Sequence, residues 1–214
     1  MNDLDFAALL VSRVCHDLVS PVGAVVNGLE VLEEERDTAL RADALKLVGS
    51  SASQAAARLQ FARIAFGAAG SAAAELDLTE VGRMVTGFLS GGKCQLDWGV
   101  PPVNWPKDWA KLLMNCTILA ADALPRGGKI SVRASASSAA PGFAVRASGQ
   151  GARVQEEVMR VLRGEPSLPF DGRTIQPHLT YRLATHLRTE VALAIHEGSV
   201  TVSAGEMADD DGAA

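Results

Sequence analysis

The sequence predicts an α+β protein in which an N-terminal antiparallel helical hairpin, forming a four-helix bundle in a dimer, is followed by an α/β sandwich. Apolar residues recur at intervals of three and four through the N-terminal segment, and an alanine-rich segment without proline follows after a short polar turn. Beyond about residue 70, helical segments are mixed with short runs that alternate apolar and polar residues. This order indicates helices on one face of a mixed sheet.

Composition and charge exclude several classes of protein. The 214 residues suffice for one large domain or two small ones, and the 48% hydrophobic content is ordinary for a chain with a buried core. The net charge of -5, without a Lys/Arg-rich block, gives no indication of a nucleic-acid surface. No apolar run approaches the ~20 residues that span a bilayer, and the start MNDLDFAALLVSRVCHD is acidic, unlike a signal peptide. We therefore expect a cytoplasmic protein.

The hairpin is predicted from two helical segments. The first is expected over residues 4–35 and the second over residues 39–66, with Asp37 or Thr38 as the cap of the second. The apolar stripe of the first helix consists of Val11, Val14, Leu18, Val22, Val25, Leu29 and Leu32. Because an isolated hairpin has too little to bury this stripe against, we predict that two copies associate as a homodimer.

The rest of the chain is expected to form the sandwich. The small-residue run GAAGSAAA places a boundary near residue 70, which gives a hairpin domain over 1–70, a sandwich domain over 71–205 and a disordered acidic tail over 206–214. Helices are expected in LDLTEVGRMVTGFL, WPKDWAKLLMNCTILAADALP, RVQEEVMRVLRG and IQPHLTYRLATHLRT. Strands are expected in CQLDW, KISVRASA and GFAVRASG, and VALAIHEGSVTVSA reads as a hairpin that turns at Glu197-Gly198.

His16 is the candidate for chemistry in the first helix. It lies roughly opposite the apolar stripe and should face water. Asp17 follows directly, and a carboxylate that holds the proton on one ring nitrogen leaves the other nitrogen as a nucleophile. Pro21 lacks an N–H, so it leaves the Asp17 carbonyl unpaired and permits a bend beside His16. This arrangement suits phosphoryl transfer, which needs in-line positioning above all, although a solvated surface histidine is the alternative.

These residues carry a family resemblance. The string HDLVSP at 16–21 resembles the H-box of two-component histidine kinases, in which the phospho-accepting His precedes an acidic residue, a Leu and a Pro. The longer string CHDLVSPVGAVVNGLEVL at 15–32 resembles the ChpT family of histidine phosphotransferases from alphaproteobacteria. WAKLLMNCTILAADALPRGGKISVRAS at 109–135 resembles the N-box helix and next strand of a histidine-kinase ATPase domain. The resemblance covers nearly the whole chain except the tail.

The resemblance implies a phosphotransferase in a multistep phosphorelay. His16 would accept a phosphoryl group from the aspartate of a CckA-type hybrid kinase receiver and pass it to CtrA-type and CpdR-type response regulators, while Asp17 orients the imidazole. No cofactor or metal of its own is expected, because Mg²⁺ would arrive with the receiver. Docking is expected on the exposed face of the first helix and the facing part of the second, at Ser20, Gly23, Asn27 and Arg58.

The nucleotide site of the ATPase-like domain reads as degenerate. Asn115 occupies the N-box position that helps to hold magnesium in kinases, although it could equally bond to a neighbouring loop. The run ASGQG at 147–151 replaces Asp-x-Gly-x-Gly, so Ala147 offers no acceptor to an adenine amine. The second glycine-rich loop is replaced by LPFDGRTIQPHLT at 168–180. We infer a retained fold that has lost its nucleotide.

Two alternatives stay open: a sensor-less ATP-dependent histidine kinase, and a non-enzymatic scaffold that binds response regulators. The remaining candidate groups favour structural roles. Three separate cysteines read as reduced packing thiols, with Cys15 buried on the apolar stripe. The other histidines, at positions 178, 186 and 196, are expected to be structural or exposed.

Overall fold

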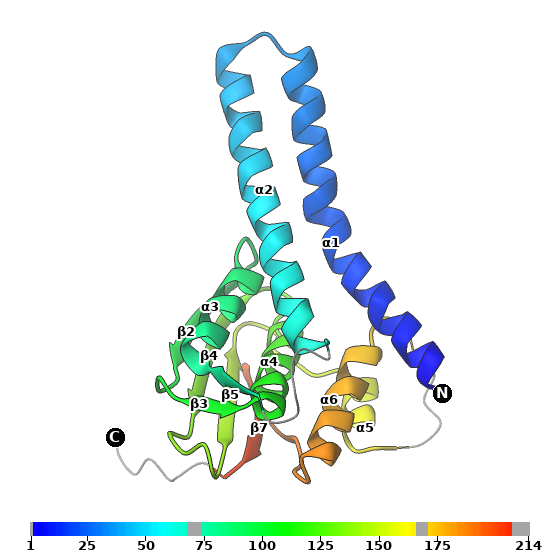
Figure 1. Ribbon diagram of the computed structural model, residues 1–214, viewed down its shortest axis with the longest axis vertical. Helices are drawn as coiled ribbons and strands as arrows, with labels where there is room; N and C mark the ends of the chain where they lie inside the picture. Colours follow the sequence, from blue (N-terminus) through cyan, green and yellow to red (C-terminus); the bar gives the residue numbers. More distant parts are fainter. Residues whose placement is uncertain (1, 68–73, 166–170, 207–214) are drawn as a thin grey trace.

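The computed structural model describes residues 2–67, 74–165 and 171–206, and in it a long helical hairpin projects from an α/β body (Figure 1). The hairpin consists of α1 (Asp3–Glu34) and α2 (Thr38–Ala65), within one residue of the predicted bounds. The Asp37 side chain accepts hydrogen bonds from the backbone N–H groups of Ala39 and Leu40, as the sequence predicted for a cap. The proposed boundary at residue 70 and the tail beyond Glu206 lie outside the described residues.

The two helices stay close near the tip and diverge toward the body. Gly28 of α1 is buried, and a Cβ there would lie 2.6 Å from Val48 Cγ2 of α2, so a larger residue would push the helices apart. Pro21 lies inside α1, and the N-terminal half of the helix splays away from α2 (Figure 1). This divergence lets the body approach α1 beside His16.

The body is a two-layer α/β sandwich, as the sequence predicted. Its mixed sheet has the strand order β2-β4-β5-β7-β6, in which only β2 and β4 pair in parallel. The strands are β2 (Cys94–Gly99), β4 (Gly128–Ala134), β5 (Gly142–Ser148), β6 (Ala192–His196) and β7 (Ser199–Gly205). The helices are α3 (Leu78–Leu89), α4 (Lys107–Asp122), α5 (Glu156–Leu162) and α6 (Ile175–His186).

One face of the sheet forms the core with the helices. Strand alternation places Val132, Val145 and Val202 side by side across three strands, and all three are fully buried. The helix α4 packs over this face, and ten of its residues are buried. The hairpin between β6 and β7 turns at Glu197 and Gly198, as predicted, and Gly198 supplies the positive φ of 71° that the turn requires.

A two-stranded sheet that the sequence analysis missed packs beside α3 and α4. It pairs β1 (Glu75–Asp77) with β3 (Asn104–Pro106), so the helix expected from Trp105 begins only at Lys107. Strands of three residues are too short to show an alternating pattern. Asp77 of this sheet also caps α3, because its side chain accepts a hydrogen bond from the Thr79 N–H.

The last turns of α2 belong to the core of the body. Phe61 and Ala65 have no exposed surface, and the Phe61 ring stacks on Phe88 of α3 at a centroid distance of 4.2 Å. Asn115 of α4 donates a hydrogen bond of 3.0 Å to the Ala65 carbonyl. The hairpin is therefore fixed to the body by buried contacts in addition to the chain itself.

Phe61→Ala is expected to lower the free energy of unfolding by ~3–5 kcal/mol, because a fully buried phenylalanine leaves a cavity when truncated. Urea denaturation of the variant and the parent protein measures this loss. Leu47→Ala is the matched control on the same helix, since Leu47 is 46% exposed. A loss no greater than that of the control would contradict the assignment of Phe61 to a shared core.

Candidate functional site

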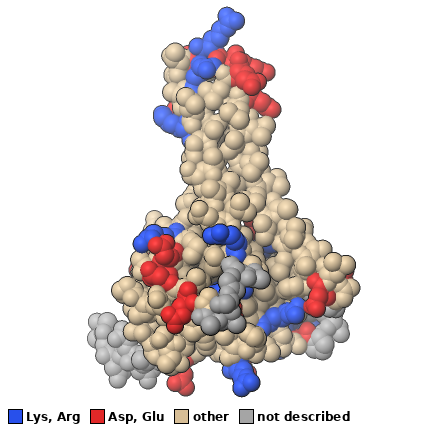
Figure 2. Space-filling model, in the orientation of Figure 1, with Lys and Arg blue, Asp and Glu red and all other residues tan. Residues whose placement is uncertain are grey.

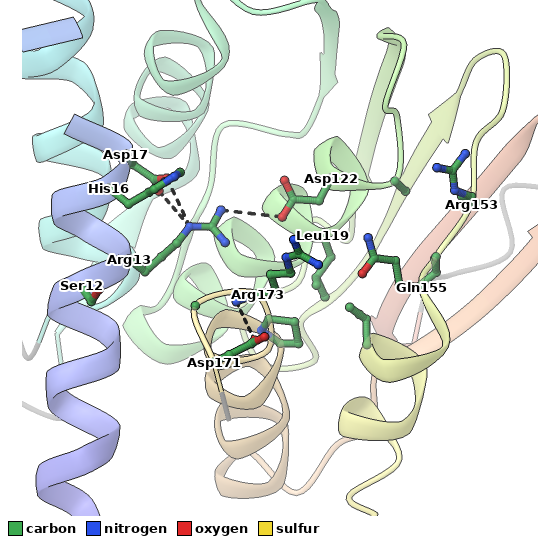
Figure 3. Close-up of a pocket in the computed structure, with 15 residues that line it drawn as sticks. Ser12, Arg13, His16, Asp17, Leu119, Asp122, Arg153, Gln155, Asp171 and Arg173 are labelled. Atoms are coloured by element: carbon green, nitrogen blue, oxygen red, sulfur yellow. Dashed lines mark hydrogen bonds and ion pairs between the residues drawn. The ribbon is translucent and has the colours of Figure 1, made fainter. Parts of the chain in front are cut away.

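His16, Asp17 and Arg13 form a contiguous polar group on α1 (Figure 3). The His16 Nδ1 lies 3.4 Å from Asp17 Oδ1, and the His16 side chain is 84% exposed, as expected from the helix pattern. The Arg13 Nε donates to both oxygens of the same carboxylate, at 3.3 and 3.1 Å. Because Nδ1 faces the carboxylate, Nε2 is the ring nitrogen left open to solvent.

The carbonyl of Asp17 accepts a hydrogen bond from a side chain in place of the backbone N–H that Pro21 lacks. Arg58 of α2 donates from Nη1 to this oxygen at 2.5 Å. Such a bond satisfies a polar group that would otherwise be left unpaired within the hairpin. Arg58 therefore lies at the depth of His16, as the position of the turn predicted.

A cleft of about 630 Å³ opens beside His16, between α1 and the body. Its α1 wall carries Ser12, Arg13, His16 and Asp17, and its opposite wall comes from α4, the segment after β5 and the turn before α6. Figure 3 shows Arg13 reaching across toward Asp122, with Arg173 and Arg153 farther along the body wall. Among the described residues, three arginines and three aspartates line the cleft, so the formal charges of these six side chains balance.

Asp122, at the end of α4, is the residue of the body that forms an ion pair with this group. The Arg13 Nη2 lies 3.7 Å from Asp122 Oδ2. Loss of hydration in the cleft raises the pKa of the Asp122 carboxyl, although 60% of its side-chain surface is exposed. The guanidinium of Arg13 opposes this rise in the pKa, whereas the negative charge of Asp17 adds to it.

The residues expected to form the docking surface lie next to His16 on the hairpin. Ser20 and Asn27 are exposed, and Gly23 lies between them on the same side of α1. A Cβ on Gly23 would meet no atom within 4 Å, so its surroundings are open. Arg58 lines this region from α2, but its guanidinium is engaged by the Asp17 carbonyl.

Asn115 and Ala147, two of the positions from which the sequence predicted a lost nucleotide site, are both fully buried. The Asn115 side chain is fully buried; its Nδ2 donates to the carbonyls of Ala65 and Lys111, and its Oδ1 accepts from Gln176 Nε2 at 3.0 Å. Ala147 lies in β5 with no exposed surface. Asn115 therefore bonds within the protein, as the alternative expected, but its partner is the end of helix α2 and not a loop.

The other candidate groups do not form a second site. In the part of the chain that the structure describes, no cluster of three or more His, Cys, Asp and Glu side chains could hold a metal ion. Cys116 is buried and Cys94 is half-buried, but the prediction that Cys15 is buried was wrong. Cys15 is exposed because it lies on a side of α1 that α2 does not cover.

Sequence reasoning missed Arg13, Asp122 and Gln176. A signal for Arg13 was available, since Arg and Asp four residues apart lie on one helix face and pair readily. No local pattern connects Asp122 to residue 13 or Gln176 to residue 115. These contacts follow only from the packing of the body against the hairpin.

The chain is similar to known proteins in sequence and in fold. A family model described as the histidine phosphotransferase C-terminal domain matches residues 78–199. The chain is 39% identical over 205 residues to the protein phosphotransferase ChpT of Brucella abortus (strain 2308), covering 95% of this chain and 97% of that protein. A solved structure of a bacterial phosphotransferase matches with a TM-score of 0.85 and 38% identity, covering 95% of this chain and 97% of that one. The chain therefore belongs to the ChpT-type histidine phosphotransferase family.

Proposed function

We propose that the chain transfers phosphoryl groups between receiver domains of a multistep phosphorelay, with His16 as the carrier. The proposal depends on one observation: an exposed imidazole whose Nδ1 faces a carboxylate that is itself held by Arg13. This geometry keeps Nε2 unprotonated and accessible for in-line attack. The upstream partner would be the receiver of a CckA-type hybrid kinase, and the downstream partners CtrA-type and CpdR-type response regulators.

The transfer step balances without a cofactor of the chain's own. The phosphorus–oxygen bond of the receiver's aspartyl phosphate breaks as the bond between His16 Nε2 and phosphorus forms, and the aspartate leaves as a carboxylate. The proton stays on Nδ1, where the Asp17 carboxylate compensates the positive charge of the phosphorylated ring. Mg²⁺ would come with the receiver, and the return step to a second receiver reverses these events.

Docking on the hairpin face around Ser20, Gly23 and Asn27 would bring the receiver's aspartate to Nε2. These residues follow His16 toward the hairpin tip at helical spacings of three and four. The open space around Gly23 allows close approach of a partner backbone, and the hydrogen bond from Arg58 fixes the backbone of Asp17 beneath the site.

We propose that the body does not supply ATP-dependent kinase activity. Asn115 makes hydrogen bonds to Ala65 and Gln176, and these would have to break before the side chain could take part in holding magnesium. Ala147 has no side-chain acceptor for the adenine amine, which leaves that base without its discriminating contact. These two features favour a phosphotransferase over a sensor-less kinase.

A homodimer is supported by apolar surface along the hairpin. On α1 this surface consists of Val11, Val19, Val22, Val26 and Leu29, spaced along one side of the helix and 47% to 69% exposed. Leu45 and Leu59 of α2 are exposed to a similar degree. The middle of the hairpin shows no charged side chains on the face drawn in Figure 2. A second hairpin would cover this surface in a four-helix bundle.

By length and composition α1 could cross a membrane, contrary to the expectation that no segment is apolar over a sufficient length. One such helix is weak evidence, because core helices of soluble proteins and signal sequences pass the same test. We favour the bundle and a cytoplasmic location, since receiver domains need access to His16.

Wild-type protein is expected to take label from a phosphorylated hybrid-kinase receiver and none from ATP with magnesium, whereas His16→Ala takes label from neither. His196→Ala is the matched control, because His196 is an exposed histidine on β6 and should leave labelling intact. Label from ATP would establish the kinase instead. If wild-type protein takes label from neither source but still binds the receiver, the result would favour the non-enzymatic scaffold.

Val26→Glu is expected to convert the dimer to a monomer at micromolar concentration, as measured by light scattering, because it places a charge in the apolar bundle core. Ile195→Glu is the control: Ile195 is 47% exposed and Val26 is 48% exposed, but Ile195 lies on β6, away from the hairpin. A monomeric wild type, or a dimer that persists in Val26→Glu, would contradict the proposed four-helix bundle.

A further inference from the structure

We propose that the body positions the phosphoryl-accepting histidine through a chain of ion pairs in which Asp122 holds Arg13, and Arg13 holds Asp17 against His16. Arg13 and Asp122 are then positioning residues, since neither contacts the reacting Nε2. The proposal rests on the proposed function of His16, and it assigns a role to the body that requires neither a nucleotide nor a receiver.

Helix geometry alone does not bring the side chains of His16 and Asp17 together. Side chains of consecutive helical residues point about 100° apart, so they do not normally face each other. Arg13 precedes Asp17 by four residues and lies on the same helix face, where its Nε engages both carboxylate oxygens. Arg13 thereby fixes the carboxylate in an orientation that keeps Oδ1 within 3.4 Å of His16 Nδ1.

Arg13 is in turn held from the other side of the cleft. Its guanidinium lies between two carboxylates, with Asp17 of α1 on Nε and Asp122 of α4 3.7 Å from Nη2. The Arg13 side chain is only 17% exposed and that of Asp17 22% exposed, so solvent screens this group less than a surface pair. Asp122 is anchored in turn by a helix whose residues 112–120 are all buried.

The charges make Arg13 the central member of this chain. Without its guanidinium, the carboxylates of Asp17 and Asp122 would face each other across the cleft without a cation between them. Asp17 would then turn away, and the exposed His16 ring, whose rotamers exchange rapidly, would lose the acceptor that selects its tautomer. Removal of Asp122 alone would leave Arg13 on Asp17 but free to change rotamer, so a smaller effect in the same direction is expected.

The test uses full-length Arg13→Gln, Asp122→Asn and the double variant, with two readouts on the unpartnered protein. Long-range ¹H–¹⁵N NMR reports the tautomer of the His16 ring. Single-turnover phosphorylation by phosphoramidate reports its reactivity without any docking step, and receiver binding is measured separately. Arg83→Gln and Asp43→Asn are the controls, because both residues make exposed ion pairs on other elements. Melting temperatures identify variants that are globally destabilised.

Arg13→Gln is expected to lower the Nδ1–H tautomer population and to slow phosphorylation of His16 by about three- to tenfold, with receiver affinity unchanged. Asp122→Asn should have a smaller effect, and the double variant should be no slower than Arg13→Gln, because the two residues act in series. Additive effects of the two changes would overturn the proposal. So would an unchanged His16 tautomer in both variants.

The proposed function can fail separately from this inference. If receivers do not phosphorylate wild-type His16, the phosphorelay assignment is lost. The NMR comparison still decides whether Asp122 and Arg13 control the ring, since it is made on unphosphorylated protein.

Discussion

The structure depends on one constraint: the end of the helical hairpin is part of the core of the body. Phe61 and Ala65 of α2 are fully buried in a hydrophobic cluster that continues through α3, α4 and the sheet. Separation of the hairpin from the body would expose this apolar surface and leave the Ala65 carbonyl and Asn115 without each other. The body is consequently fixed on the hairpin. This attachment sets the position of the body wall of the cleft relative to the α1 wall that carries His16.

The contacts on α1 complement this attachment. Near the start of the helix, the Arg182 guanidinium lies 4.8 Å from the centre of the Phe6 ring, which also contacts His178 at 5.8 Å. Burial there lowers the pKa of His178, and the charge of Arg182 lowers it further. About two turns farther along α1, Arg13 joins Asp17 to Asp122. The body thus contacts both helices of the hairpin, α2 through the shared core and α1 through aromatic and charged side chains that precede His16.

Much of this could be read from the sequence, for physical reasons that differ between elements. The hairpin was predictable because apolar spacing and the Asp37 cap are local signals, and the unpaired Asp17 carbonyl followed from Pro21. The sequence placed Arg58 near the depth of His16 in the hairpin, but it did not predict the hydrogen bond from Arg58 to that carbonyl. Asn115 was recognised as a position, but its actual partners, Ala65 and Gln176, are 50 and 61 residues away and follow from packing alone. Cys15 was misassigned because the apolar stripe on α1 is wider than the face that α2 covers.

Native-state hydrogen exchange tests most directly whether hairpin and body act as one unit. The amides of residues 61–65 in α2 and those of β5 should exchange with the same opening free energy and the same dependence on denaturant, because one buried core contains both. If the end of α2 instead opens at a much lower free energy while β5 stays protected, the hairpin is a separate unit. The body could not then hold the residues around His16 in place.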